Sequence, residues 1–223
     1  MIKAVILDLD DTTFMTEAAC FNLENDVLSA MGRMPMSREV HLQTWGRPLF
    51  EAIRDRSPGV DVEKFRQVYE PLIGHYVANG MLDVVPPETL TAIDEMRTGL
   101  NKAVLALTSR EESELRHILA ADHPLRSRLE EIYHKDNMQY HKPDPLAFEH
   151  IERNHGWRPD ECVYVGDSTS DAEAAKGAGL HFVASLESGL RTREDFAPYP
   201  VDAFIDDIPG LIPVLQQLDA RTE

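Results

Sequence analysis

The chain contains little cysteine and no long apolar run. Its two cysteines, Cys20 and Cys162, lie far apart in the 223 residues and outside any Cys-x-x-Cys spacing. Neither a disulfide framework nor a cysteine-ligated zinc site is indicated, and a reducing, intracellular setting fits this cysteine content. The first apolar run, at residues 4–7, stops at Asp8, too early for a signal peptide or a membrane span. We therefore expect a cytoplasmic protein.

Basic residues are also scarce. The sequence has 22 Lys and Arg against 39 Asp and Glu, which gives a formal net charge of −17. So acidic a chain is repelled by the phosphate backbone of nucleic acid and by anionic lipid, because both attract clusters of Lys and Arg. We therefore expect neither nucleic acid nor a membrane surface as a partner. The hydrophobic content of 43% is that of a globular protein with a buried core.

Short, wholly apolar runs recur along the chain and indicate strands. Four such runs cover residues 4–7, 103–107, 162–165 and 181–184, and weaker ones cover 131–133 and 203–205. Runs of this kind are typical of strands that are buried on both faces of a parallel sheet. Helical patterns lie between them, so we predict an α/β core. In such sheets, ligands bind beyond the carboxyl ends of the strands.

Two of the helical patterns begin with capping signals. Ser109 and Glu112 form an S-x-x-E capping box, and Asp144 followed by Pro145 supplies an N-cap and a proline at the first helical position. A further helix is expected at residues 88–98, where it leads into the second strand.

Residues 14–84 interrupt the alternation of strands and helices. Two apolar helical faces occur there, one over residues 23–31 and one over residues 62–76, with no convincing strand between them. Pro71 falls within the second pattern, so this helix is expected to be kinked or broken there. We predict a core domain of residues 1–13 and 85–223 and an inserted helical domain of residues 14–84.

Acidic residues follow two of the expected strands. Asp8 and Asp10 stand on alternate positions directly after the first strand, and Asp167 follows the strand at residues 162–165. Hard divalent cations prefer oxygen ligands and tolerate dense negative charge. Three ionised carboxylates that converge without a cation would repel one another and destabilise the fold. The pattern therefore predicts a metal site at this edge of the sheet.

Two further residues complete a set that phosphoryl transfer requires. This chemistry needs a nucleophile, a metal and donors that neutralise the charge on the phosphoryl oxygens. Thr108, at the end of the second strand, can donate its hydroxyl, and Lys142 can supply a positive charge. A carboxylate can attack phosphorus and form an aspartyl phosphate.

The four motifs that carry these residues, in this order along the chain, resemble those of the haloacid dehalogenase superfamily, in its phosphatase branch with a helical cap inserted after the first motif. The resemblance implies a Rossmann-like parallel sheet core with a small inserted helical cap domain. It also implies that Asp8 is the nucleophile and that Asp10 is the general acid and base. Thr108 and Lys142 would hold the phosphoryl group, and Lys142 would also orient Asp8.

The same resemblance implies a magnesium ion that is bound by Asp8, the carbonyl of Asp10 and Asp167, with Asp171 in or beside the metal site. Asp171 has a second interpretation, because Ser168-x-x-Asp171 is also a capping pattern for the helix that follows.

Other positions bear on the first turn and on substrate binding. Asp11 stands where the family often has glycine, and aspartate is one of the few side chains that tolerate a left-handed backbone.

Arg47, in the segment of residues 45–48, resembles a residue of the family's substrate-specificity loop and can pair with a second anionic group. Ser109 and Arg110 are further candidates for substrate binding, although Ser109 also serves the expected capping box.

Several residues narrow the expected activity. Asp10 argues against the dehalogenase branch, which lacks this aspartate because no alkoxide leaving group needs a proton. The phosphonate-cleaving branch uses a lysine near the start of its cap, but the only lysine of residues 14–84 is Lys64. Cys20 stands where the sugar-phosphate mutases place a histidine, which favours transfer of the phosphoryl group to water over transfer to a second sugar. Met15 stands where members that resemble phosphoglycolate phosphatase commonly carry an aspartate, so the motif does not identify the substrate.

We therefore expect magnesium-dependent hydrolysis of a small phosphorylated metabolite, a phosphate monoester, through an aspartyl-phosphate intermediate. Two alternatives stay open: a phosphomutase or phosphotransferase of the same family, and a non-catalytic binding protein on this fold. The presence of all the motif residues argues against the second alternative, because a decayed enzyme need not retain them.

Overall fold

A computed structural model describes residues 1–45 and 47–221 of the chain. The chain folds into two compact units, of which the first comprises Met1–Phe14 and Val85–Glu223 and the second comprises Met15–Val84. Phe14 therefore belongs to the first unit, where its side chain is fully buried. None of the described helices combines the length and the apolar content that crossing a bilayer requires.

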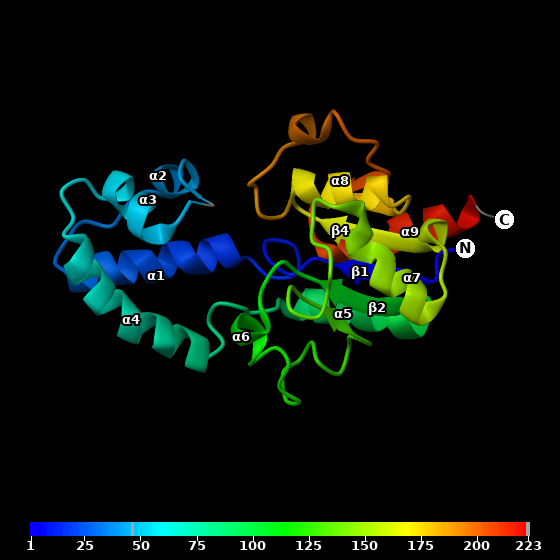
Figure 1. The fold of residues 1–223 in the computed structure, drawn as a ribbon, viewed down its shortest axis with the longest axis horizontal. Coiled ribbons are helices and arrows are strands. Elements are labelled where there is room, and N and C mark those ends of the chain that lie inside the picture. Colours follow the sequence, from blue (N-terminus) through cyan, green and yellow to red (C-terminus); the bar gives the residue numbers. More distant parts are fainter. Residues whose placement is uncertain (46, 222–223) are drawn as a thin grey trace. The chain divides into compact units, whose positions relative to one another are not determined.

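The first unit is built on a six-stranded parallel sheet (Figure 1). The strand order is β3-β2-β1-β4-β5-β6, so the first strand lies between its two motif-bearing neighbours. The strands are β1 (Ala4–Leu7), β2 (Ala103–Leu107), β3 (Ile132–Tyr133), β4 (Cys162–Gly166), β5 (His181–Ser185) and β6 (Ala203–Ile205). All six predicted strands are confirmed, with ends that differ by at most one residue.

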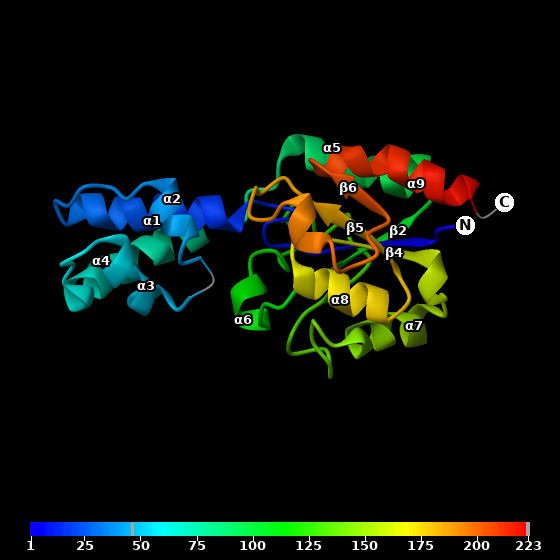
Figure 2. The ribbon, with the colours of Figure 1, turned by 90° about the horizontal axis from the view of Figure 1, so that it is seen from above.

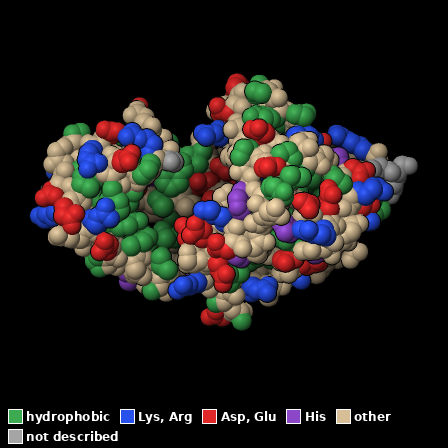
Figure 3. Space-filling model, viewed as in Figure 1, with side chains coloured by type: hydrophobic (Ala, Val, Ile, Leu, Met, Phe, Trp, Pro, Cys, Tyr) green, Lys and Arg blue, Asp and Glu red, His purple; other side chains and the backbone are tan. Residues whose placement is uncertain are grey.

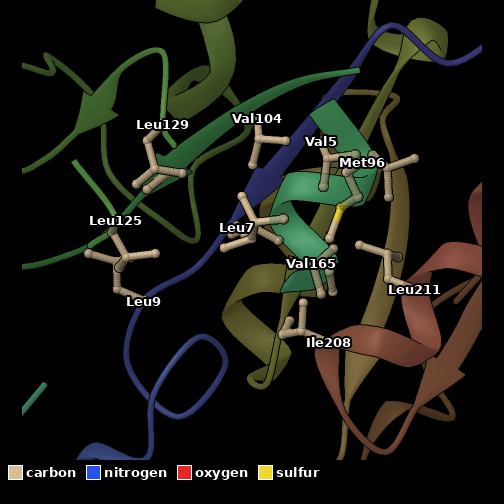
Figure 4. Packing of buried hydrophobic residues seen from close by; sticks show 14 of the residues in the cluster. Val5, Leu7, Leu9, Met96, Val104, Leu125, Leu129, Val165, Ile208 and Leu211 are labelled. Carbon is tan, nitrogen blue, oxygen red and sulfur yellow. The ribbon is translucent and has the colours of Figure 1, made fainter. Parts of the chain in front are cut away.

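Helices cover both faces of this sheet (Figure 2). On one side lie α5 (Pro87–Asp94) and α9 (Leu211–Ala220), and on the other lie α7 (Glu149–His155) and α8 (Thr169–Gly177). The alternating side chains of each strand supply two hydrophobic clusters. Val5, Val104 and Val165 face the α5 and α9 side, where Met96 and Leu211 pack on them (Figure 4). The predicted α/β class with a buried parallel sheet is therefore confirmed.

The shorter helical segments show where the sequence prediction was wrong. The helix after β2 does not start with a Ser109–Glu112 capping box. Instead α6 (Glu112–Leu115) is a single turn, and the backbone N–H of Glu111 donates to the Glu114 carboxylate over 2.8 Å. Just before the helix, the backbone of Glu111 is extended, and the carbonyl of Arg110 accepts a hydrogen bond from the backbone N–H of Lys135.

The other two helix predictions for the core hold in part. Asp144 caps as expected, since its carboxylate accepts from the backbone N–H of Leu146 over 2.9 Å, but the first turn is a 3-10 helix and α7 begins only after it. The helix expected at residues 88–98 is α-helical in α5 and continues as a π-helical turn. The π-helical turn is Glu95–Gly99, and the 3-10 turns are Pro145–Phe148, Pro159–Glu161, Arg193–Phe196 and Ile208–Gly210.

The second unit is helical. It contains α1 (Thr16–Ala30), α2 (Arg38–Leu42), α3 (Leu49–Arg56) and α4 (Val62–Ala78). Of the two outcomes expected at Pro71, a kink or a break, the break is wrong, because α4 continues through this residue. The side chains on either side of the proline, Tyr69 and Leu72, pack on the small core of the unit, and this packing offsets the lost backbone hydrogen bond.

A buried polar cluster joins three helices of the second unit. His41 of α2 is fully buried and lies between two carboxylates of α1, with Nδ1 2.7 Å from Glu17 and Nε2 3.3 Å from Glu24. Arg56 of α3 donates to both oxygens of Glu24 over 2.7 Å. The two buried carboxylates thus have partners, as buried charges need, and His41 has a structural role in this unit.

Charged side chains of both signs are spread over the face of the molecule that Figure 3 shows, among polar and hydrophobic ones. Red acidic groups are scattered among blue basic ones instead of forming one block. The large acidic excess is thus a property of the solvated surface as well as of the site described next.

Candidate active site at the carboxyl end of the sheet

Three neighbouring strands end in chemically active side chains. Asp8 follows β1, Thr108 follows β2 and Asp167 follows β4, and these strands are adjacent in the sheet. The sheet reverses its strand order at β1, because β2 lies on one side of it and β4 on the other. Such a switch point leaves a crevice beyond the strand ends. The structure therefore brings these three residues together, as the parallel arrangement predicts.

The loop after β1 holds Asp8 in place through backbone contacts. The N–H of Asp8 donates to the carbonyl of Val165 over 2.8 Å, and its carbonyl accepts from the hydroxyl of Thr13 over 2.6 Å. Asp11 adopts the left-handed backbone expected from the sequence, with φ of 56°. The turn therefore returns the chain at Phe14 without moving Asp8 from the end of its strand.

Lys142 reaches this cluster from a distant loop. Its ammonium donates to Asp8 Oδ1 over 2.9 Å and to the Tyr164 hydroxyl over 2.8 Å, and it lies 2.7 Å from Asp171 Oδ1. Its side chain is only 6% exposed. Burial alone would lower the pKa of Lys142, but the charges of Asp171 and Asp8 outweigh it and raise that pKa above its usual range. Lys142 therefore stays a cation beside the proposed nucleophile.

The three carboxylates of Asp8, Asp167 and Asp171 form a candidate cation site. Each offers one carboxylate oxygen, and these three oxygens lie within 4.8 Å of one another. Burial raises the pKa of Asp8 to about 7, a shift that Lys142 opposes and the charges of Asp171 and Asp10 increase. Burial, followed by the charge of Asp8, raises the pKa of Asp167 to about 9. A cluster that is this reluctant to ionise fits a divalent cation with oxygen ligands.

Asp171 performs two tasks in the structure. One carboxylate oxygen lies against Lys142, and the other accepts hydrogen bonds from the N–H and hydroxyl of Ser168 over 3.0 and 2.7 Å at the start of α8. The capping interpretation and the placement beside the site are therefore compatible. Gly166 permits this approach, because a Cβ on it would lie 2.5 Å from Asp171 Oδ2.

Asp10 and Arg110 form an ion pair across 100 residues of sequence. The guanidinium Nε lies 3.1 and 3.0 Å from the two carboxylate oxygens of Asp10, and a terminal nitrogen also donates to the same carboxylate. The guanidinium carbon lies 5.3 Å from the centre of the Phe14 ring. Arg110, a predicted substrate-binding residue, therefore stands beside Asp10.

Thr108 and Ser109 occupy different environments. Thr108 is fully buried, and its hydroxyl oxygen accepts from the backbone N–H of Arg110 over 3.2 Å, which leaves the hydroxyl proton available to donate. Ser109 is exposed. The predicted capping role of Ser109 is wrong, because Glu111 and Glu114 form the capping box of α6.

Arg47 lies in the second unit. Its guanidinium pairs with Asp55 over 2.8 Å, and both side chains are about half exposed, 48% and 59%. Gly46, which belongs to the same predicted loop, lies outside the described residues.

The sequence prediction missed Tyr164. This residue lies within β4, and its hydroxyl contacts Lys142, Asp171 and the carbonyl of Leu107. One signal was available, because a tyrosine within an otherwise apolar buried strand needs a partner for its hydroxyl. The sequence alone does not identify that partner.

Comparisons with known proteins give one consistent result. Residues 5–185 match the family model described as haloacid dehalogenase-like hydrolase. The chain is 26% identical over 217 residues to phosphoglycolate phosphatase of Rhodobacter capsulatus, an alignment that spans 95% of this chain and 97% of that protein. It is 29% identical over 229 residues to phosphoglycolate phosphatase of Pseudomonas savastanoi pv. phaseolicola, spanning 98% and 82% of the two chains.

Solved structures share the fold. A haloacid dehalogenase superfamily hydrolase of subfamily IA from Geobacter sulfurreducens superposes with a TM-score of 0.69 at 24% identity, over 96% of both chains. A predicted phosphoglycolate phosphatase from Haemophilus somnus superposes with a TM-score of 0.72 at 18% identity, over 96% of this chain and 98% of that one. At these identities the likeness shows the architecture.

Proposed function

Because the chain belongs to the haloacid dehalogenase-like hydrolases, we propose that it hydrolyses small phosphate monoesters through an aspartyl phosphate on Asp8. The observation that carries the proposal is the contact of Lys142 with Asp8 beside the carboxylates of Asp167 and Asp171. This arrangement, with the Asp8 carboxylate, a buried ammonium and two further carboxylates at one edge of the sheet, supports the proposal. The phosphatase names of the relatives support the same reaction.

The reaction uses groups of the chain in two steps. A carboxylate oxygen of Asp8 attacks phosphorus, the bond from phosphorus to the ester oxygen breaks, and the leaving alkoxide takes a proton from Asp10. Asp10 then accepts a proton from water, whose oxygen attacks phosphorus and releases Asp8 and inorganic phosphate. Thr108 donates its hydroxyl to a phosphoryl oxygen in both steps.

Magnesium fits the carboxylates of this site. Asp8 and Asp167 would hold it together with the carbonyl of Asp10, and Asp171 stands beside them against Lys142. The bound ion would supply positive charge that favours the ionised carboxylates and neutralises the phosphoryl oxygens.

We further propose phosphoglycolate, or a similar small phosphate that carries a second anionic group, as the substrate. Two observations support a small polyanionic substrate: the relatives named above are phosphoglycolate phosphatases, and Arg110 presents a guanidinium beside Asp10. A second anion would compete with Asp10 for this guanidinium and thereby release the carboxylate for proton transfer. We assign the helical unit as the cap domain, with Arg47 as its candidate substrate contact.

A phosphatase assay with and without magnesium tests the proposal. We expect magnesium-dependent release of phosphate from p-nitrophenyl phosphate and from phosphoglycolate, loss of both activities in Asp8→Asn, and unchanged activities in the matched control Asp122→Asn. Asp122 is exposed and lies in the same unit. Acid quenching during turnover should trap a phosphorylated chain in the wild type and not in Asp8→Asn.

Three outcomes would contradict the proposal. The first is wild-type protein that releases no phosphate from any of a panel of phosphorylated metabolites. The second is equal turnover by Asp8→Asn. The third is transfer of the phosphoryl group to an added sugar phosphate in place of release to water, which would identify a phosphotransferase or mutase.

A further inference from the structure

Tyr164 is held rigidly within the sheet. Its side chain is fully buried in β4. Its ring packs against Phe148 at an interplanar angle of 71° with the ring centres 5.0 Å apart, and beside Phe182 with the ring centres 6.4 Å apart. A ring that is packed on its neighbours at this density cannot reorient without moving the core. The position of the tyrosine hydroxyl is therefore fixed by the fold.

The hydroxyl of Tyr164 meets three polar atoms. It lies 2.8 Å from Lys142 Nζ, 3.1 Å from Asp171 Oδ1 and 3.4 Å from the carbonyl oxygen of Leu107. An ammonium group only donates, so the hydroxyl accepts from Lys142 and its own proton remains for Asp171. Burial and the charges of Asp171 and Asp8 raise the pKa of Tyr164 well above its ordinary value, so this proton stays in place.

The Lys142 ammonium has one partner for each of its three N–H bonds. These partners are Asp8, Asp171 and Tyr164, and they hold a side chain that is almost entirely buried. Without the tyrosine hydroxyl, one N–H of a buried cation would face aromatic carbon and have no acceptor. The ammonium would then move toward its nearer carboxylate, Asp171, and weaken its contact with Asp8.

We propose that Tyr164 is a positioning residue for the nucleophile: its hydroxyl fixes the Lys142 ammonium and thereby holds the Asp8 carboxylate in the orientation for attack on phosphorus. The catalytic consequence rests on the proposed function, whereas the contact between Tyr164 and Lys142 does not. The Tyr164 hydroxyl is enclosed by Lys142, Asp171 and the carbonyl of Leu107, so its effect on Asp8 passes through Lys142 and needs no contact with the substrate.

Tyr164→Phe tests the proposal, because it removes the hydroxyl and keeps the ring. We expect kcat for phosphoglycolate to fall by on the order of 10- to 100-fold while KM changes by less than about threefold, since a hydrogen bond to a charged group is lost and substrate contacts are kept. Tyr133→Phe is the matched control. It removes a buried tyrosine hydroxyl from β3 whose partners are Glu131, Asn154 and His155, and both parameters should stay within about twofold of wild type.

A spectroscopic measurement separates positioning from a merely structural role. The ammonium of Lys142 should give a slowly exchanging ¹⁵N–¹H resonance, assigned by its loss in Lys142→Met, with a nuclear Overhauser contact to the Tyr164 ring protons. Tyr164→Phe should broaden this resonance through faster exchange with water, and Tyr133→Phe should leave it unchanged. This wild-type contact tests the geometry even where the Tyr164 variant does not fold.

Several results would overturn the inference. They are a kcat of Tyr164→Phe within about twofold of wild type, an ammonium resonance that survives unchanged in this variant, and a wild-type protein that shows no such resonance or no contact with the tyrosine ring. A wild-type protein without phosphatase activity would instead contradict the proposed function, and the resonance would still decide the contact. An active wild type with an equally active Tyr164→Phe variant would contradict the inference alone.

Discussion

Replacing the proposed nucleophile should stabilise the metal-free protein. Asp8 is buried, and burial raises its pKa from 3.8 to about 7, so the folded state disfavours the ionised carboxylate relative to the unfolded chain. In Asp8→Asn this unfavourable ionisation is gone. Lys142 keeps Asp171 as a partner at 2.7 Å, and the new amide oxygen can still accept its hydrogen bond. The buried cation is therefore not left alone by the substitution.

The size of this effect depends on pH. A carboxyl group whose pKa is higher in the folded state contributes stability that is fully present below pH 3.8 and is lost as the pH rises through about 7. At 1.36 kcal/mol per pKa unit, the difference corresponds to about 4 kcal/mol. We therefore expect Asp8→Asn and the wild type to be similar near pH 4. The variant should be more stable by about 4 kcal/mol above pH 7, a figure that already includes the attraction between Lys142 and the ionised Asp8, because this attraction is part of the pKa of about 7.

Urea unfolding in the presence of a chelator measures this difference. The chain has two tryptophans, Trp157 in the first unit and Trp45 in the second, so a Trp45→Phe background reports unfolding of the first unit by fluorescence. Asp122→Asn, which removes an exposed carboxylate from the same unit, is the control. The reasoning is refuted if Asp8→Asn is less stable than wild type at pH 8, or if its advantage does not grow between pH 4 and pH 8. Saturating magnesium should stabilise the wild type more than the variant.

Four further outcomes are expected. Lys142→Met should lower the free energy of unfolding by about 3 kcal/mol in urea and abolish turnover, because it leaves two buried carboxylates without their cation. Gly166→Ala should lower kcat and the melting temperature, since its Cβ would displace the Asp171 carboxylate, whereas Gly74→Ala, with nothing within 4 Å, should change neither for the worse. Arg110→Gln should reduce kcat/KM for phosphoglycolate by about tenfold or more, and less for p-nitrophenyl phosphate, which lacks a second anion; equal losses would contradict the assignment. At saturating magnesium, kcat/KM for a dianionic substrate should rise with moderate salt, because screening weakens repulsion by a chain of net charge −17, and a steep fall would refute this.

The strands were predictable because each signal is local. An apolar run such as residues 103–107 is buried on both sides in the folded sheet, so its composition alone marks it. The gathering of Asp8, Thr108 and Asp167 at one edge also follows from the pattern, because consecutive parallel strands end on the same side. Topology therefore converts three separate stretches of sequence into one site.

Other features depend on contacts that no local pattern contains. Arg110 lies 100 residues from Asp10, and Lys142 lies 22 residues from Tyr164, so their pairing is set by the sheet order and by loop paths. The capping box at Ser109 failed for a related reason. The loop after β2 is tied to Lys135 through the carbonyl of Arg110, and this tertiary contact delays the start of the helix.

The same architecture explains how the molecule tolerates so unfavourable a cluster. The strands that carry Asp8 and Asp167 are buried on both faces, and hydrophobic clusters on the two sides of the sheet fix their ends in space. Side chains at these ends cannot move into water or away from one another, so burial, and after it the repulsion between the carboxylates, keeps the pKa values of Asp8 and Asp167 raised. A looser sheet would relax the repulsion by displacing the carboxylates, and the affinity for a cation would decrease with it. The buried carboxylates therefore lower the stability of the metal-free protein, and a cation bound between them would offset this loss. The rigidity of the core maintains the arrangement that binds the cation.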